Sequence, residues 1–563
     1  MQKRWHIKEG NPVLERRLSE TLKIHPIIAK LLVSRDIHDI EKAQQFLSAQ
    51  ISELHDPFIL KDLKVAVDRI YQAKQNAERV LIFGDYDVDG ITSSVILSKL
   101  LKGLGLEVVN HIPHRMTDGY GLNMGIVEVA KSQNIKLIIA VDCGTSSHEE
   151  IKALKSAGID VIVIDHHEPP EGERPHALAM VNPKQKTCSY PFKDLASAGL
   201  VAKLAQALHG KIEDGILALA AVGTVSDVAL LRGENRIFVK HGLSKLHETQ
   251  NKGILALLEV AKIKGKKVSP FHVGFIIGPR LNAAGRMDTA HVALDLLMTE
   301  DSQEALRLAK ILDDYNLARQ KTQKDIISEA IELVDQEINF SREKVIVLNR
   351  EGWHKGVLGI VASRLREKYY RPAIVISTKD GVGTASARSI DGFHIQEALE
   401  QCSQHLESFG GHKGAAGLTI RLDKIDPFRS LINEVAEKTI GLEDLMPSIA
   451  IDSEIPFSNL TLDLVDMIAQ MEPFGEGNPE PVFCSRHLMV KSPAVVLGKD
   501  TLKFWVTDGQ KTLSAVGFGM AEYKPLIKVG QPIDLAYQLT IDDWNKAPTL
   551  QLKLKDVKAT SGV

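Results

Sequence analysis

The stretch VLIFGDYDVDG, residues 80–90, decides the fold class of this chain. Its first four residues are apolar and predict a buried strand, and an amphipathic helix is expected to follow. Between the two, Asp85, Asp87 and Asp89 occupy the turn at the carboxyl end of the strand, where open parallel sheets bind ligands. Three carboxylates this close repel one another unless a cation neutralises them, and carboxylates suit Mg²⁺ or Mn²⁺. The alternative, a polar loop with a capping aspartate, accounts less well for three alternating aspartates.

The alternation of apolar runs and amphipathic stretches continues beyond this turn. It predicts strands at 80–83, 108–113, 137–142 and 161–167, and helices at 90–104, 123–133, 147–157, 196–209 and 212–230. Strands separated by helices of this length indicate βαβ units. The expected fold class is therefore α/β with a parallel sheet.

Further acidic and imidazole side chains fall at the ends of predicted elements. Asp142 ends the strand LIIAVD, and Asp165, His166 and His167 end VIVIDHH. Asp227 interrupts the apolar stretch AAVGTVSDVALL. Asp142 or Asp227 alone could simply cap a helix. Together these positions are enough for two metal ions, which predicts hydrolysis of phosphate esters, and the imidazoles favour Mn²⁺ over Mg²⁺.

The pattern of predicted helices and strands divides the chain into five regions. We expect an N-terminal helical region at 1–75, a metal-binding domain at 76–300, a long connecting helix at 301–341, a second α/β domain at 342–440 and a barrel at 447–563. The connecting helix should begin at Asp301, because Asp301 and Glu304 form a capping box. The short, closely spaced strands of the last region are typical of the five-stranded oligonucleotide-binding (OB) barrel.

Composition excludes several protein classes. The 563 residues are 44% hydrophobic and 25% charged, with a formal net charge of -3, unlike a histone-type basic nucleic-acid binder. The four cysteines match neither a zinc site nor a disulfide framework, so a reducing compartment is expected. We see no secretory signal and no stretch of about 18 apolar residues, and we expect a cytoplasmic protein.

Six motifs in order, with a barrel-like region after them, carry a resemblance to a known family. GDYDVDG, VDCGTSS, IDHHEPP, VGTVSDV, IGPRLNAAGRMD and GGHKGAAG, with the barrel after them, resemble the DHH phosphoesterase superfamily and, more closely, the bacterial RecJ family. The resemblance implies DHH, DHHA1 and OB-like domains. It also implies a 5′→3′ exonuclease specific for single-stranded DNA, which releases 5′-mononucleotides in recombination and repair and uses two divalent ions, Mn²⁺ or Mg²⁺.

The resemblance also implies roles for individual residues. The implied metal ligands are Asp85, Asp87, Asp89, Asp142, His166 and Asp227, with Asp142 bridging and direct ligation by Asp85 left open. The implied catalytic group is Asp142, Asp165 and His167. Of these, His167 would donate to the phosphate, and Asp165 would hold the histidines in place.

Substrate contacts follow from the same resemblance. Arg115, Arg280, His354, Arg388, Ser389 and His412 are expected at the strand, with Arg280, Arg388 and Ser389 on its 5′-phosphate. The alternative for each arginine is a surface salt bridge. Phe504, Trp505 and Trp544 could stack on bases, although the first two point to opposite faces of a strand and one of them must be core.

Two other functions stay open at this point. A small-molecule phosphoesterase, such as a pyrophosphatase or a hydrolase of oligonucleotides or cyclic dinucleotides, would have no use for the barrel. A non-catalytic nucleic-acid-binding partner would not need every acidic position to be filled. Single-strand-binding protein and a RecQ-type helicase are expected partners by resemblance only, and we expect a monomer.

Overall fold

The computed structural model describes residues 3–115, 119, 121–170, 172, 174–246, 248–542 and 548–560. The chain forms two compact units. The larger unit contains His55–Asp227 and His241–Pro447, and the smaller contains Met1–Leu54, Val228–Lys240 and Ser448–Val563. Each unit is therefore built from segments that are distant in sequence.

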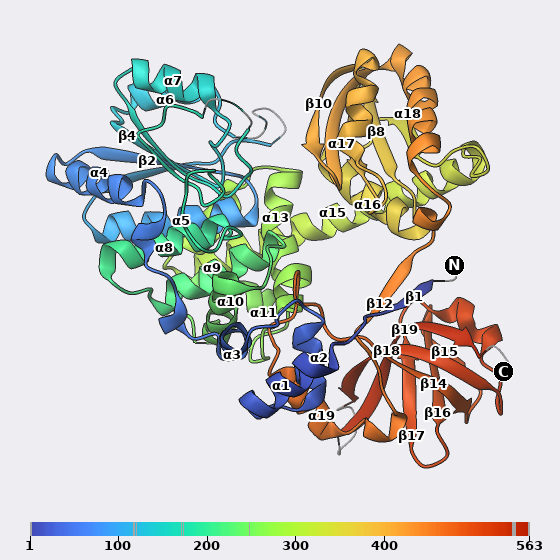
Figure 1. Cartoon of the computed structure of the whole chain (residues 1–563). Helices are drawn as coiled ribbons and strands as arrows, with labels where there is room; N and C mark the ends of the chain where they lie inside the picture. The colour runs from blue at the N-terminus through green and yellow to red at the C-terminus, as the bar shows by residue number, and fades with distance from the viewer. Residues whose placement is uncertain are drawn as a thin grey trace. The chain divides into compact units, whose positions relative to one another are not determined.

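The first sheet of the larger unit is fully parallel, as predicted (Figure 1). Its strands are β2 (Arg79–Gly84), β3 (Glu107–His111), β4 (Leu137–Val141), β5 (Asp160–Ile164) and β6 (Ala179–Val181). The spatial order is β3-β2-β4-β5-β6, so the chain leaves β2 in one direction and returns to its other side as β4. The gap between the carboxyl ends of β2 and β4 is the switch point at which such sheets bind ligands.

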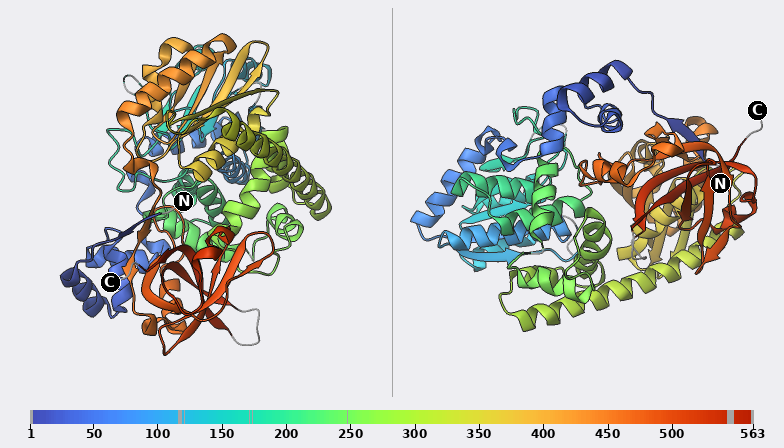
Figure 2. Two further views of the ribbon diagram at one scale, coloured as in Figure 1. Left: turned by 90° about the vertical axis from the view of Figure 1, so that its right-hand side faces the viewer. Right: turned by 90° about the horizontal axis from the view of Figure 1, so that it is seen from below.

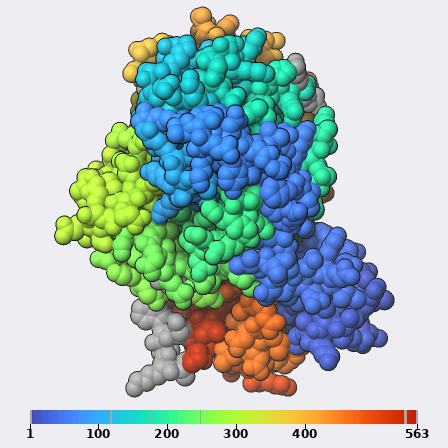
Figure 3. Space-filling view, turned by 90° about the vertical axis from the view of Figure 1, so that its left-hand side faces the viewer, coloured from blue at the N-terminus to red at the C-terminus, as the bar shows by residue number. Residues whose placement is uncertain are grey.

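Helices cover both faces of this sheet. In Figure 1, α6 (Gly125–Ser132) and α7 (His148–Ser156) lie on one face, and α5 (Val88–Gly103) and α8 (Ser197–His209) lie on the other. In the space-filling view of Figure 3, helix α4 (Leu63–Gln75), coloured blue, lies below the region of α6 and α7, coloured cyan and green. Burial on both faces explains why the strands are nearly all apolar.

Helix α5 is buried almost all round, because it packs against the sheet, α8 and α9 (Asp214–Ser226). The helix predicted at 212–230 is shorter than expected, because α9 begins at Asp214 and ends at Ser226. The remaining helices of this half are α11 (Lys252–Val260), α12 (Pro270–His272), the π-helix η3 (Val273–Ile277), α13 (Gly278–Met287) and α14 (His291–Met298). Within the described residues, the structure contains no helix with both the length and the apolar character needed to span a membrane.

The long connecting helix is confirmed as α15 (Ser302–Glu337), seen as the yellow-green rod in the right panel of Figure 2. Asp301 caps it by accepting hydrogen bonds from the backbone N–H groups of Gln303 at 2.7 Å and Glu304 at 3.0 Å. The second sheet follows, in the order β10-β11-β9-β8-β7. Its elements are β7 (Ile346–Glu351), α16 (Leu358–Tyr369), β8 (Ala373–Lys379), β9 (Val382–Arg388), α17 (Ile395–Gln401), β10 (Leu406–His412), β11 (Ala415–Arg421) and α18 (Ile425–Thr439).

The smaller unit contains the predicted barrel, closed by pairing of β14 with β16. Its strands are β13 (Ser453–Glu454), β14 (Phe483–Val490), β15 (Val495–Leu497), β16 (Thr501–Thr507), β17 (Thr512–Gly517), β18 (Pro532–Asp542) and β19 (Thr549–Ala559). The other elements are β1 (Arg4–Ile7), α1 (Pro12–Leu22), α2 (Pro26–Val33), α3 (Ile40–Ser48), β12 (Ser448–Ile451), α19 (Leu462–Ala469) and most of α10 (Gly233–Lys245).

A shared core explains why the N-terminal helices belong to this unit. Leu18 of α1 and Ile28 of α2 pack in one cluster with barrel residues such as Phe504. The buried Arg236 joins the segment Val228–Lys240 to the other two segments of the unit. Its guanidinium donates to the carbonyls of Phe46 and Glu472, each at 2.7 Å.

Candidate metal centre

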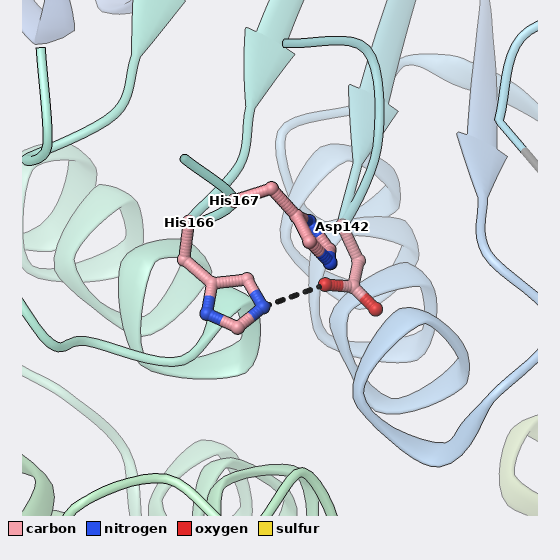
Figure 4. A group of neighbouring side chains, drawn as sticks. All are labelled: Asp142, His166 and His167. Carbon is pink, nitrogen blue, oxygen red and sulfur yellow. Dashed lines mark ion pairs between the residues drawn. The ribbon is translucent and has the colours of Figure 1, made fainter. Parts of the chain in front are cut away.

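The acidic and imidazole side chains predicted from the sequence gather at the carboxyl edge of the parallel sheet. Asp85 follows β2, Asp142 follows β4 and His166 follows β5, while Asp227 is the C-terminal cap of α9. The His166 Nε2 atom lies 3.3 Å from Asp142 Oδ1 (Figure 4) and 3.8 Å from Asp227 Oδ2. It lies 4.0 Å from Asp89 Oδ2. The switch point of the sheet therefore holds the whole predicted set.

The candidate ligand atoms fall into three overlapping groups, and within each group all atoms lie within 4.8 Å of one another. The groups are Asp85, Asp87 and Asp142; Asp89, His166 and Asp227; and Asp142, His166 and His167. Asp142 and His166 each belong to two of the groups, so Asp142 links the group of Asp85 and Asp87 to the group that contains His166 and His167. Oxygen donors with one or two imidazoles fit Mn²⁺ or Mg²⁺.

The electrostatics of the carboxylates also fit a pair of cations. Burial and the charge of Asp87 raise the pKa of Asp85 to about 8 and that of Asp89 to about 7. Burial and the charge of Asp89 raise the pKa of Asp227 to about 8, and the pKa of Asp142 lies well above its usual range for the same two kinds of reason. The site therefore holds surplus negative charge that only protons or cations can neutralise.

Two buried atoms point to the same conclusion. Among the described residues, His166 Nε2 and Asp85 Oδ1 have no hydrogen-bond partner although both are buried. Burial and the neighbouring charge of His167 lower the pKa of His166 to about 4, so its imidazole is neutral at physiological pH. A neutral imidazole is the form that binds metal ions.

Asp165 holds both histidines in place and does not belong to any of the three ligand groups. Its Oδ1 accepts from His167 Nδ1 at 2.7 Å and from the His166 backbone N–H at 2.7 Å, and its Oδ2 accepts from the Thr145 backbone N–H at 3.0 Å. Burial alone would raise the pKa of Asp165, but these hydrogen bonds keep it below its usual range. For His167, burial is outweighed by Asp165, which raises the histidine pKa to about 9.

Backbone groups fix the other carboxylates. Asp89 accepts from the N–H groups of Ser197 at 2.7 Å and Ala198 at 2.9 Å, at the start of α8. Asp87 accepts from the N–H groups of Asp89 and Gly90, so it also caps α5, and the capping interpretation and the metal interpretation are compatible at this residue. Asp142 has a φ of 63°, a left-handed backbone conformation that is uncommon for non-glycine residues, although aspartate adopts it more readily than most.

Close packing leaves no room for side chains at two glycines of this site. A Cβ atom at Gly90 would lie 2.5 Å from the Asp85 carbonyl oxygen. A Cβ atom at Gly223 would lie 2.7 Å from Asp89 Oδ1. Glycine at these positions lets α5 and α9 approach the carboxylates closely.

Of the predicted substrate arginines, Arg115 lies near the metal centre, and Arg388 lies near Arg115. The Arg115 guanidinium lies 4.9 Å from the centre of the Tyr86 ring, within the first acidic turn. Arg388 donates to the carbonyl of Ala387 at 2.8 Å. Burial lowers the pKa of Arg388, and the charge of Arg115 lowers it further, so the two cations are close enough to interact.

Among the predicted substrate contacts, base stacking by Phe504 is wrong, and Arg280 and Ser389 have protein partners in the structure. Arg280 is held by Asp313 Oδ1 at 2.9 Å and by the Ile276 carbonyl at 2.8 Å, which matches the salt-bridge alternative. Ser389 is buried, and its hydroxyl donates to the Phe393 carbonyl at 2.7 Å. Phe504 is 1% exposed in the barrel core and cannot stack on a base, whereas Trp505 is 44% exposed.

The structure gives less information on the other residues predicted to contact the substrate. His354 Nδ1 accepts from the Gly356 N–H at 3.1 Å and so caps a short 3₁₀ helix. His412 lies exposed at the end of β10. Trp544 lies outside the described residues.

Arg286 is the residue that the sequence interpretation missed. Its Nη1 donates to the Gly356 carbonyl at 3.0 Å. Burial and the charge of Arg115 lower its pKa to about 10, while Asp87 and Tyr86 act in the opposite direction. Arg286 therefore lies near the metal centre, six residues after Arg280 in the same motif. The sequence feature that could have identified Arg286 is the run of small residues between the two arginines.

Three family models match the chain. They are the DHH family N-terminal domain at residues 79–224, the DHHA1 domain at 342–438 and the RecJ OB domain at 451–556. Each falls on a region described above: the metal-binding sheet, the second sheet and the barrel. The three models follow the order of the predicted domains.

Curated relatives match over nearly the whole chain. The single-stranded-DNA-specific exonuclease RecJ of Bacillus subtilis is 39% identical, over 98% of this chain and 70% of the relative. The protein of the same name from Haemophilus influenzae is 33% identical, over 95% of this chain and 96% of the relative. The crystal structure of RecJ in complex with Mn²⁺ from Thermus thermophilus matches with a TM-score of 0.86 and 29% identity, over 100% of this chain and 80% of that one.

Proposed function

Because the chain belongs to the RecJ family of single-stranded-DNA-specific exonucleases, we propose that it degrades single-stranded DNA from the 5′ end by metal-dependent hydrolysis. The products would be 5′-mononucleotides. The observation that carries this proposal is the convergence of five carboxylates and an imidazole at the switch point of one parallel sheet.

The three ligand groups suggest how two ions would be held. Asp85 and Asp87 would hold one ion, and Asp89, His166 and Asp227 would hold the other, with Asp142 shared between them. When bound, two divalent ions lower the pKa of an attacking water and neutralise charge on the phosphate. The protein's own contribution is to fix the ligands, through the backbone groups that hold Asp87 and Asp89.

His167 would act on the phosphate directly. Asp165 binds its Nδ1 and keeps the ring protonated, and the His167 side chain is 47% exposed beside the metal ligands (Figure 4). A protonated imidazole can donate a hydrogen bond to a phosphate oxygen as negative charge develops there. Asp165 would be a positioning residue, since it reaches the reaction only through the histidines.

Arginine side chains would hold the end of the strand. We assign this role to Arg115, Arg286 and Arg388, because the charge of Arg115 contributes to lowering the pKa of both Arg286 and Arg388. Guanidinium groups match the oxygens of a terminal phosphate, and recognition of a 5′-phosphate would set the direction of digestion. Arg286 takes the place that the sequence interpretation gave to Arg280.

Other aspects stay predictions. We expect Mn²⁺ to support higher activity than Mg²⁺, because imidazole ligands favour it. We also expect a monomer that acts in the cytoplasm in recombination and repair, together with single-strand-binding protein and a RecQ-type helicase.

The direct test is a digestion assay on 5′-labelled and 3′-labelled strands. Purified protein with Mn²⁺ should release labelled mononucleotide at once from the 5′-labelled single strand, and should leave duplex DNA and RNA largely intact. An Asp142→Asn variant serves as the control for a contaminating nuclease. Early release of the 3′ label, or undiminished cleavage by the variant, would contradict the proposal.

A further inference from the structure

Two phenylalanines of the larger unit lie on the surface as a stacked pair. Phe271 of α12 is 60% exposed and Phe275 of the π-helix η3 is 72% exposed. Their ring centroids are 5.0 Å apart, with an angle of 27° between the ring planes. The four-residue spacing places both on one face of the helical segment. We call this pair the Phe271–Phe275 platform.

The backbone under the platform is firmly anchored. Val273 and Ile277 of the same π-helix are fully buried, with exposures of 0% and 1%. The segment therefore uses one face for packing and presents its aromatic face outward. Exposed apolar groups of this kind mark interaction sites more often than single exposed residues do, and π-helical turns are frequent at functional sites.

A basic loop precedes the platform directly. Its sequence, AKIKGKKV, contributes four exposed lysines, which are Lys262, Lys264, Lys266 and Lys267. Burial lowers the pKa of His272, between the two phenylalanines, and the charge of Lys266 lowers it further, so this lysine lies close to the platform. Cations beside exposed rings complement a strand with one phosphate per base.

The segment that carries the platform also packs beside the metal centre. The π-helix η3 leads into Gly278, where a Cβ atom would lie 2.8 Å from the Ser226 hydroxyl. Ser226 immediately precedes the candidate ligand Asp227. Phe275 is three residues before Gly278, which is about 5 Å along a helix axis.

A small cavity of about 130 Å³ occupies this junction. Its lining includes Gly274 and Gly278 below the platform, and Arg286 near the metal centre. The aromatic surface and the cavity therefore lie on one continuous segment, α12 to α13, which packs against Ser226 beside the candidate ligand Asp227.

We propose that the Phe271–Phe275 platform stacks on bases of the single DNA strand that leads to the metal centre, while the lysines of 262–267 contact its phosphates. The inference rests on the proposed function and adds a binding site for nucleotides beyond the one being cleaved. Its occupant is single-stranded DNA, because only a polyanion with exposed planar bases complements both the cations and the rings. Stacking on rings tolerates any base, as a sequence-independent exonuclease requires.

The test compares strand lengths. In an Asp142→Asn background, which prevents digestion, the Phe271→Ala/Phe275→Ala variant should bind a labelled 20-mer about 10- to 100-fold more weakly, by fluorescence anisotropy. With Asp142 restored, cleavage of a dinucleotide should change less than about threefold, which also shows that the variant is folded. Phe58→Ala is the matched control, because Phe58 is a 46% exposed phenylalanine of the same unit.

Two further variants separate stacking from general contact. Phe271→Trp/Phe275→Trp should retain tight binding, and the corresponding double leucine variant should not. A Lys262→Gln/Lys266→Gln variant should reduce the slope of log K against log salt by about 0.7 for each phosphate that the protein no longer neutralises.

The inference is overturned if the double alanine variant binds the 20-mer as tightly as the Phe58→Ala control, or if leucine replaces phenylalanine without loss. A change in self-association with no change in DNA binding would also overturn it, in favour of a protein partner. The proposed function fails differently, because the wild-type protein would then not digest single strands at all.

Discussion

The two ends of the parallel sheet carry charged clusters of opposite design. At the amino end, Arg69 donates to Asp160 and to Glu78, each at 2.7 Å, so opposite charges neutralise one another. At the carboxyl end, carboxylates gather around Asp142 and His166, and protonated His167, the cation of the described ligand groups, is paired with Asp165 outside those groups. Burial would raise the pKa of Glu78, but its hydrogen bonds to Asn76 and Arg69 lower it, whereas the pKa of Asp85 rises to about 8.

This difference shows which feature of a charged cluster indicates a function. A paired cluster is complete in the folded protein and contributes to stability. A cluster of like charges costs folding free energy, and it persists because a ligand from outside completes it.

The largest effect should come from Asp142, which, like His166, belongs to two ligand groups. Asp142→Asn removes the charge that both ions would share, so kcat should fall by at least about 10³-fold. The measurement is mononucleotide release with Mn²⁺. Glu78→Gln, at the amino end, is the matched control and should retain wild-type kcat. Equal losses in the two variants would remove the distinction between the ends.

A smaller loss is expected at Asp165. Asp165→Asn leaves the ligand groups intact but weakens the hold on His166 and His167, so activity should fall by about 10- to 100-fold. Because the substitution also lowers the pKa of His167, the alkaline limit of the pH–rate profile should move to lower pH. An unchanged profile would mean that Asp165 is merely structural.

At the amino end, the effect should be on stability alone. Arg69→Met leaves Glu78 and Asp160 without their cation and should lower the free energy of unfolding by about 1–3 kcal/mol, since Asp160 is half-exposed and partly screened by solvent. Urea denaturation gives this value. The kcat of the folded variant should be that of the wild type, and a large loss would tie this end to catalysis.

The smallest effect, and the most specific, concerns pH. In the folded protein, the pKa values of Asp85 and Asp227 are raised to about 8, whereas in the unfolded chain they are about 4. As pH rises above about 4, the unfolded chain therefore loses these two protons before the folded protein does, and the folded state becomes less stable relative to the unfolded state. Chelator-treated protein should therefore lose a few degrees of Tm between pH 5 and 8. Added Mn²⁺ should reverse the loss, most strongly at pH 8. The lowered pKa of Glu78 acts in the opposite sense, with stability lost only in acid.

Local pattern was enough to predict the sheet, α15 and the gathering of acidic residues. Apolar runs mark buried strands, and parallel strands bring their carboxyl ends to one edge, so the positions of Asp85, Asp142 and His166 follow from order alone. The left-handed backbone of Asp142 does not follow from pattern, because it depends on the surrounding tertiary structure.

Side-chain direction and long-range packing could not be predicted. Arg280 and Arg286 occur in the same motif, and only the helix orientation pairs one with Asp313 and directs the other toward Asp87. Phe504 is buried because of barrel register. The assignment of 228–240 to the smaller unit depends on Arg236, whose partners are more than 180 residues away in sequence.

Anomalous X-ray diffraction from crystals grown with Mn²⁺ tests the central claim most directly. Two anomalous peaks should appear at the carboxyl end of the sheet, one beside Asp85 and one beside Asp227, with Asp142 contacting both. Asp142→Asn crystals should lose at least one peak. A single peak, or none, at this edge in saturating Mn²⁺ would contradict a two-ion centre.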